Sequence, residues 1–191
     1  GAVRPTCLAP LTYTAGELRE AAEITLGEVP GFRDFFADYA VANLHATGHA
    51  ARSVTLELPY TTARRDAFAT DLARLLDRES FRSSTAQLWR PVLKGAARLG
   101  LPAILGLADA ITAWRDLSEK LGLPVFEIPV LPPSVPGMRL YHLLQSALEA
   151  ARGRVLVGPG VTGWVEAGRV LGIDGVREWR LGRFSVSNGG R

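Results

Sequence analysis

Residues 101–130 read LPAILGLADAITAWRDLSEKLGLPVFEIPV, and their pattern settles the class of fold. Residues 101–107 are almost continuously apolar, which is typical of a strand buried on both faces. Asp109 can then cap a helix, and residues 125–130 predict a second strand. The apolar face of that helix comprises Ile111, Trp114, Leu117 and Leu121. Two buried strands joined by a helix form a β–α–β unit with parallel strands.

The same alternation of strands and helices continues on both sides of this unit. Residues 24–26 and 53–58 predict strands. Helical periodicity follows the first strand over about residues 35–44, and follows the second over about residues 68–76 and 84–99. The second of these helices has Phe68, Leu72, Leu75 and Leu76 as its apolar face and Thr61 or Thr62 as its cap, and Pro91 lies within the third. A further helix has apolar residues at Leu140, Leu143, Leu144, Ala147, Leu148 and Ala151, and residues 154–157 predict another strand. We therefore expect an α/β fold, with a mostly parallel sheet and flanking helices.

The pattern changes near residue 160. Three short segments, residues 161–165, 170–173 and 176–181, are separated by glycine-containing turns, which favours a small β-meander. We expect an α/β domain over residues 1–157 and a β-meander appendage over residues 158–191. The chain starts at Gly1 without an initiator Met and ends without a capped element, so we expect an interior piece of a longer polypeptide.

The composition of the 191 residues excludes several classes of function. Cys7 is the only cysteine, so neither an internal disulfide nor a cysteine-rich zinc site can form. The formal net charge is +3, but the arginines are scattered and only Lys94 and Lys120 are lysines, so we expect no nucleic-acid partner. The longest uncharged apolar stretch, residues 99–108, is far shorter than the ~20 residues that cross a bilayer, so we expect no transmembrane segment.

Two motifs have an ordinary structural interpretation. Residues 158–163, GPGVTG, have the spacing G-x-G-x-x-G, but residues 164–170 predict a strand and a turn where a dinucleotide fingerprint needs a helix. His45 and His49 are four residues apart near a helix end, without acidic or cysteine partners close by in sequence, so we expect no metal site. His142 is expected to be an ordinary packed histidine.

Residues 131–139, LPPSVPGMR, carry the best indication of a site. They join a predicted parallel strand to a helix, at the edge where open α/β sheets bind ligands. Pro133 stiffens the loop, Ser134 can cap the helix, and Gly137 allows a close approach to the backbone. Arg139 and the free N–H groups would suit an anion. We predict that these four residues face a substrate or cofactor; the alternative is a rigid connector with Arg139 in a structural salt bridge. No catalytic residue is assigned.

The same segments carry a resemblance to a known family. Residues 101–107, residues 124–129 and the loop 131–140 resemble, in order and spacing, the B subunit of anaerobic glycerol-3-phosphate dehydrogenases. Residues 31–35, GFRDF, and residues 70–77, TDLARLLD, are similar to that family too. The resemblance covers most of residues 31–174, and the proline loop followed by Gly-x-Arg-Leu is its most specific part.

This resemblance implies a piece of a flavin-dependent subunit related to the flavoproteins of succinate dehydrogenase and fumarate reductase. Residues 1–157 would be its cap or inserted domain, and the β-meander appendage, residues 158–191, would lead back towards an absent flavin-binding domain. The parent protein would oxidise glycerol 3-phosphate to dihydroxyacetone phosphate and pass electrons towards quinone, together with a catalytic A subunit and an iron–sulfur C subunit. The flavin, FAD or FMN, would be bound at an N-terminal glycine fingerprint that this chain lacks, so no cofactor is expected in this piece and it would be inactive alone. It would be cytoplasmic, at the inner face of the membrane only through its partner subunits.

Two other interpretations remain open. The chain could be a flavodoxin-like binding module for a small anion or a partner subunit, or a purely structural docking domain. Binding of glycerol 3-phosphate that is lost in an Arg139→Ala variant would favour the self-contained binding module.

Overall fold

The computed structural model describes residues 23–59, 67–154, 162–166, 169–174 and 179–180, with the backbone alone in the last three ranges. The chain divides into two compact units, Gly1–Ser146 and Ala147–Arg191, which are described separately. Thr61 and Thr62, predicted as a helix cap, lie outside the described residues.

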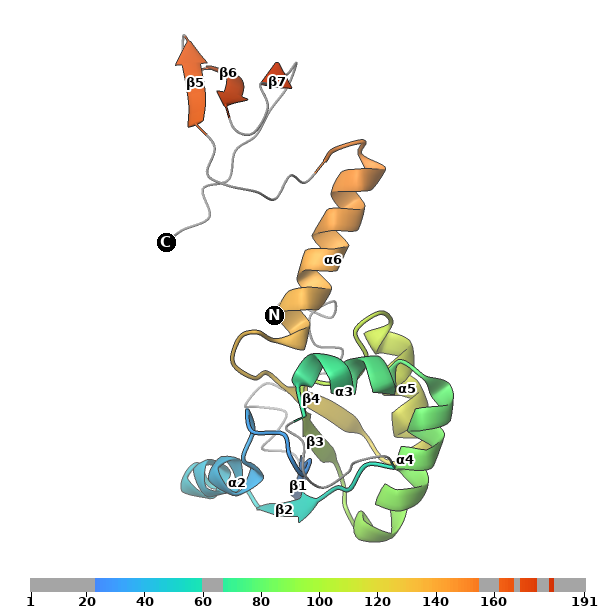
Figure 1. Ribbon diagram of the computed structural model, residues 1–191. Helices are drawn as coiled ribbons and strands as arrows, with labels where there is room; N and C mark the ends of the chain where they lie inside the picture. Colours follow the sequence, from blue (N-terminus) through green and yellow to red (C-terminus); the bar gives the residue numbers. More distant parts are fainter. Residues whose placement is uncertain (1–22, 60–66, 155–161, 167–168, 175–178, 181–191) are drawn as a thin grey trace. The chain divides into compact units, whose positions relative to one another are not determined.

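The first unit is built on a parallel four-stranded sheet. Its strands are β1 (Ile24–Glu28), β2 (Ala51–Thr55), β3 (Leu99–Pro102) and β4 (Val125–Ile128), in the order β2-β1-β3-β4 (Figure 1). All three pairings are parallel, with Leu26 opposite Ser53 and Gly100, and Leu99 opposite Val125. Strands that are buried on both faces explain why their sequences are apolar almost throughout. The predicted α/β class with a parallel sheet is confirmed.

Five helices accompany the sheet in the described residues: α2 (Ala37–Ala46), α3 (Ala69–Leu76), α4 (Glu79–Val92), α5 (Ala110–Leu121) and α6 (Val135–Ala150). Helix α2 packs along β1 and β2, and α4 and α5 pack on each other on the other side of the sheet (Figure 1). Trp89 of α4 is fully buried and donates its indole N–H to the carbonyl of Glu57, 2.7 Å away. The apolar core includes Ala37 of α2 as well as Leu72 of α3, Trp89 of α4 and Leu117 of α5.

Several predicted boundaries are wrong for identifiable reasons. Strand β2 occupies residues 51–55 rather than 53–58, although Leu56 and Leu58 are still buried beyond its end. Phe68 does not lie on the core face of α3; it is the residue before the helix and is 63% exposed. Helix α4 starts at Glu79 and ends soon after Pro91, whereas the prediction ran over residues 84–99.

Strand β3 is also shorter than predicted. It ends at Pro102, and residues 103–105 continue as a fully buried loop instead of a strand. Gly106 has a φ of +77°, in the left-handed region that favours glycine, and turns the chain towards α5. A continuous apolar run cannot by itself separate a buried strand from the buried loop that follows it.

Helix α6 differs most from expectation. Its leucines have helical spacing, as predicted, but Leu140, Leu143 and Leu144 are 37%, 50% and 59% exposed. Only Val135 and Arg139, both near its start, are buried. In the part of the chain that the structure describes, the apolar face of α6 therefore has no core to pack against.

The second unit contains an antiparallel three-stranded sheet. Its strands are β5 (Thr162–Glu166), β6 (Arg169–Asp174) and β7 (Trp179–Arg180), in that order. The predicted β-meander is confirmed. The predicted domain boundary at residues 157/158, and all of the predicted strand 154–157 except Arg154, lie outside the described residues, so both stay predictions.

Candidate functional site

A buried ion pair joins strand β4 to helix α6. The side chains of Glu127 and Arg139 are 0% and 4% exposed, and the guanidinium donates to both carboxylate oxygens at 2.7 and 2.9 Å. Burial raises the pKa of Glu127, and the hydrogen bonds and charge of Arg139 act against that rise. A pair with this forked geometry satisfies two groups that could not be buried separately without a large free-energy cost.

The same pair also holds the loop between β3 and α5. Arg139 donates to the carbonyls of Leu105, at 3.0 Å, and Gly106, at 2.8 Å. Glu127 accepts from the backbone N–H of Leu105 at 2.7 Å. Three segments that are distant in sequence, namely β4, the β3–α5 loop and the start of α6, are therefore tied together at the carboxyl edge of the sheet.

Asp77 holds this loop from the other side. It follows α3, and its carboxylate accepts from the consecutive backbone N–H groups of Leu107, Ala108 and Asp109 at 3.1 to 3.3 Å. Asp109 in turn caps α5 by accepting from the N–H of Thr112 at 3.0 Å, as the sequence predicts. The N–H groups that could bind an external anion before α5 are thus engaged by a carboxylate of the chain itself.

A second buried arginine fixes the position of Asp77. Arg82 of α4 donates to the carbonyls of Leu76 and Asp77, both at 2.9 Å, and forms an ion pair with Asp116 of α5. Lys120, one turn further along α5, contacts Asp116 and also Glu79. A continuous polar network therefore extends from α6, through the β3–α5 loop, to the junction of α3 with α4.

Two carboxylates, the α5 cap Asp109 and Asp116 within α5, should make the stability of this unit decrease at acidic pH. The hydrogen bond from Thr112 lowers the pKa of Asp109. Burial acts to raise the pKa of Asp116, but hydrogen bonds from Lys120 and Arg82 outweigh it and lower this pKa. A carboxyl with a lowered folded-state pKa stabilises the fold above its unfolded pKa of about 3.9, and this contribution is lost as the pH falls through the folded value.

We therefore expect the thermal unfolding midpoint to fall as the pH drops from about 5 to about 3. Asp109→Asn should make this fall less steep, because asparagine still caps the helix but does not titrate. Glu127, with its raised pKa, acts in the opposite sense in both proteins and so cancels in the comparison. Circular dichroism melting curves across this pH range measure both slopes; equal slopes would contradict the assignment of Asp109.

The four predicted site residues occupy different environments. Pro133 is exposed in the loop after β4, and Ser134 precedes α6 and accepts from the N–H of Gly137 at 3.3 Å, as a capping residue does. A side chain at Gly137 would place its Cβ 3.2 Å from the Ser134 hydroxyl. Arg139 is buried and forms the salt bridge that was the alternative to a ligand contact. The roles of these residues towards a ligand stay predictions.

Sequence reasoning missed Glu127, Asp77 and Arg82. A signal existed for Glu127, since it is the one charged residue within the apolar segment 125–130, and a buried charge needs a partner. Asp77 and Arg82 gave no signal, because charged residues at helix ends are common on protein surfaces. His45 contacts the carbonyl of Ala51, and His49 contacts the hydroxyl of Thr47. His142, which was predicted to be packed, is exposed because it lies on the part of α6 that is not buried.

The described residues do not fit a dinucleotide cofactor. The G-x-G-x-x-G segment at 158–163 lies mostly outside them, and its last two residues open strand β5, where pyrophosphate binding needs a helix. None of the four strands of the parallel sheet is followed by this glycine spacing. Within the described parts of the chain, no helix is long and apolar enough to span a bilayer, and no three potential ligand residues are placed to hold a metal ion.

Comparison with known proteins defines the class of this chain. Residues 1–171 match the family model described as "FAD binding domain", and the chain belongs to this family. Its curated relatives include the probable B subunit of the anaerobic glycerol-3-phosphate dehydrogenase of Halobacterium salinarum, which is 35% identical over 83% of this chain. The corresponding B subunits of Pectobacterium atrosepticum and Yersinia pestis are 34% and 31% identical over 78% and 84% of the chain. No solved structure matches.

The resemblance to the B subunit that the sequence indicates is thereby confirmed. The matches cover only 40%, 37% and 39% of these relatives, so the chain spans about two fifths of their length.

Proposed function

We propose that this chain is a part of the B subunit of an anaerobic glycerol-3-phosphate dehydrogenase, and that it works joined to a flavin-binding part. The whole subunit would take part in oxidising glycerol 3-phosphate to dihydroxyacetone phosphate, with electrons passing towards quinone. Its partners would be a catalytic A subunit and an iron–sulfur C subunit, and it would reach the membrane only through them. The identity to relatives that carry the name of this B subunit supports the proposal.

The exposed apolar face of α6 is the observation that carries the proposal. Leu140, Leu143 and Leu144 lie on one side of the helix, at the i, i+3, i+4 spacing of a buried face. Exposed apolar surface of this kind marks an interaction site in a soluble domain. The relatives are more than twice as long as the matched region, and they share a family described as FAD-binding. We therefore assign the face to the remaining part of the same subunit.

A chimeric protein tests this proposal. Residues 23–174 would replace the matching segment of the Pectobacterium atrosepticum B subunit, and the chimera would be expressed with the other subunits of that enzyme. We expect it to retain flavin and to support reduction of an artificial electron acceptor by glycerol 3-phosphate. A folded chimera that contains flavin but lacks this activity would reject the proposed substrate. A folded chimera without flavin would reject the proposed role in the subunit.

The chain alone provides a complementary measurement. Because the described residues offer no dinucleotide cradle, we expect the purified chain to show no visible flavin absorption after addition of FAD and gel filtration. Stoichiometric retention of FAD or FMN would show that the chain carries its own flavin site, contrary to the proposal.

We expect the double substitution Leu143→Gln, Leu144→Gln to separate folding from assembly. Both side chains are at least half exposed, so the free energy of unfolding of the chain alone should change by less than about 0.5 kcal/mol. In the chimera, each buried leucine contributes about 1.5–3 kcal/mol, so the yield of flavin-containing protein should fall tenfold or more. His142→Gln, a change at an exposed position beside them, is the control and should leave the yield unchanged.

The binding-module alternative remains a prediction with a defined test. Titration calorimetry with glycerol 3-phosphate would detect a self-contained anion site in the chain. Arg139→Ala is a poor probe by itself, because it also removes the partner of Glu127. Ser134→Ala and Gly137→Ala change exposed or partly exposed positions at the start of α6 and are better suited. Binding that both variants weaken would favour the binding module over the incomplete subunit.

A further inference from the structure

We propose that the buried pair of Glu127 and Arg139 is an orientation lock for helix α6: it fixes the direction in which this helix leaves the parallel sheet. The inference concerns the chain itself and does not depend on the proposed function. It starts from how little of α6 is buried. Of its 16 residues only Val135 and Arg139 are buried, and they lie one turn apart at its beginning.

The two buried residues act differently. Val135 is a small apolar side chain that packs into the core, and such a contact restricts rotation of a helix only weakly. Arg139 makes directional bonds: two to the carboxylate of Glu127 on β4, and one each to the carbonyls of Leu105 and Gly106. A planar guanidinium held by acceptors from two different segments has one orientation in which all these bonds form.

The acceptors of Arg139 are themselves held in place. Glu127 is fixed by the N–H of Leu105 and by its position in β4, and the β3–α5 loop is held on its far side by Asp77. The groups that accept hydrogen bonds from Arg139 are therefore held in fixed positions. Residues 140–150 extend about 16 Å beyond Arg139 at 1.5 Å per residue, so a small change in angle at the pair moves the end of α6 by several ångströms.

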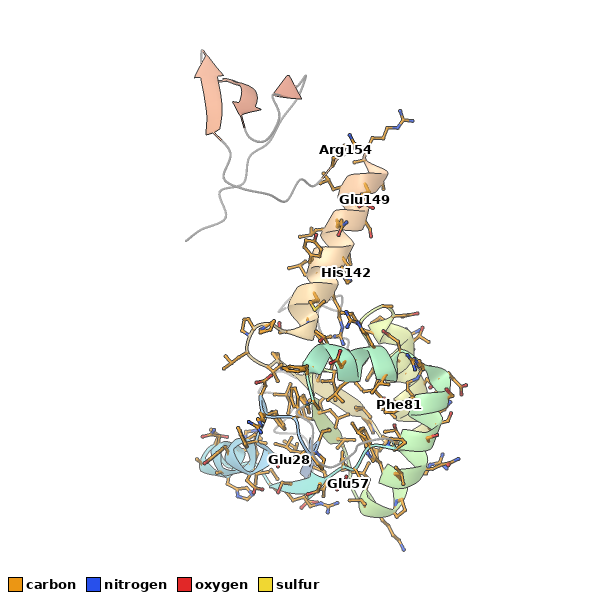
Figure 2. All side chains as sticks on the ribbon, in the orientation of Figure 1. Glu28, Glu57, Phe81, His142, Glu149 and Arg154 are labelled. Atoms are coloured by element: carbon orange, nitrogen blue, oxygen red, sulfur yellow. The ribbon has the colours of Figure 1, made fainter. Side chains whose placement is uncertain are left out.

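Distance measurements between two spin labels can test the lock. One label would replace His142 on the exposed part of α6 (Figure 2). The other would replace the exposed Glu119 on α5, and both would be placed in a Cys7→Ser background. A second pair, at Glu57 and Glu119, reports on the sheet and helices without α6. The chain with the native lock should give a narrow distribution of distances for both pairs.

Two conservative substitutions weaken the ion pair. Arg139→Lys keeps the positive charge but cannot make the two parallel hydrogen bonds of the guanidinium, and Glu127→Gln keeps the shape of the side chain but removes its charge. We expect each to broaden the His142–Glu119 distribution at least twofold while leaving the Glu57–Glu119 distribution unchanged. Arg74→Lys, in an exposed ion pair with Asp71, is the matched control and should change neither.

The remaining outcomes reject the proposal. If the α6 distribution stays narrow in both variants, other contacts orient the helix. If both label pairs broaden together, the ion pair stabilises the unit as a whole and does not specifically orient α6.

Discussion

Replacing Arg139 with methionine is expected to lower the free energy of unfolding by about 3–5 kcal/mol, because Glu127 would remain buried without its counter-ion. The carboxylate is fully buried, and Arg139 supplies two of its hydrogen bonds. Methionine fills much of the volume of arginine, so the loss would come from charge and hydrogen bonding more than from a cavity. Urea denaturation followed by tryptophan fluorescence measures the change.

A double variant identifies the cause of this loss. In Glu127→Leu, Arg139→Met both charges are absent, and a buried ion pair replaced by apolar residues is often nearly neutral for stability. We expect the double variant to recover most of the loss seen in Arg139→Met. Arg74→Met breaks an ion pair in which both side chains are 60% exposed, and should cost less than about 1 kcal/mol. A loss in Arg139→Met as small as that of Arg74→Met would contradict the buried pair.

Asp77→Ala is the second substitution with a large expected effect. It removes the acceptor of three successive N–H groups, and hydrogen bonds to a charged group contribute about 1.5–3 kcal/mol to stability. Water can reach part of this loop, since Ala108 and Asp109 are exposed, so we expect a loss of about 2 kcal/mol in urea denaturation.

Hydrogen exchange distinguishes this role of Asp77 from a general loss of stability. The amides of Leu107 and Ala108 should exchange faster in Asp77→Ala than the change in global stability explains, because their acceptor is gone. Asp109→Ala removes only the cap of α5 and should cost about 1 kcal/mol. If the two variants were equally stable and showed the same exchange at Leu107, Asp77 would have no special part in holding the loop.

The sequence predicted those features that depend on local pattern. The strands β1, β3 and β4 follow from short apolar segments bounded by glycine, proline and charged residues, and the cap at Asp109 follows from its position before an amphipathic helix. The meander follows from turns at regular spacing. Each of these depends on residues close together in the chain, so they are visible in one sequence.

The polar network could not be predicted in the same way. Glu127 and Arg139 are 12 residues apart, Asp77 and Leu107 are 30 apart, and Arg82 and Asp116 are 34 apart. These pairs meet only because the order of the strands brings their elements together. The exposure of the apolar face of α6 could not be predicted either. Periodicity shows that a helix has an apolar side, and not whether the surface that covers it belongs to the described residues.

The strand order β2-β1-β3-β4 has a further consequence for small ligands. The chain after β1 leads to β2 and the chain after β3 leads to β4, so the two connections run in opposite directions from the boundary between β1 and β3. In open parallel sheets, nucleotides usually bind in the crevice at such a switch point. Here Val29 and Phe32 follow β1, Ile104 and Leu105 follow β3, and all four are buried apolar residues. Exposing these side chains to admit a ligand would cost about 1.5–3 kcal/mol for each. The segments that leave both strands at the switch point are thus anchored in the core by apolar side chains.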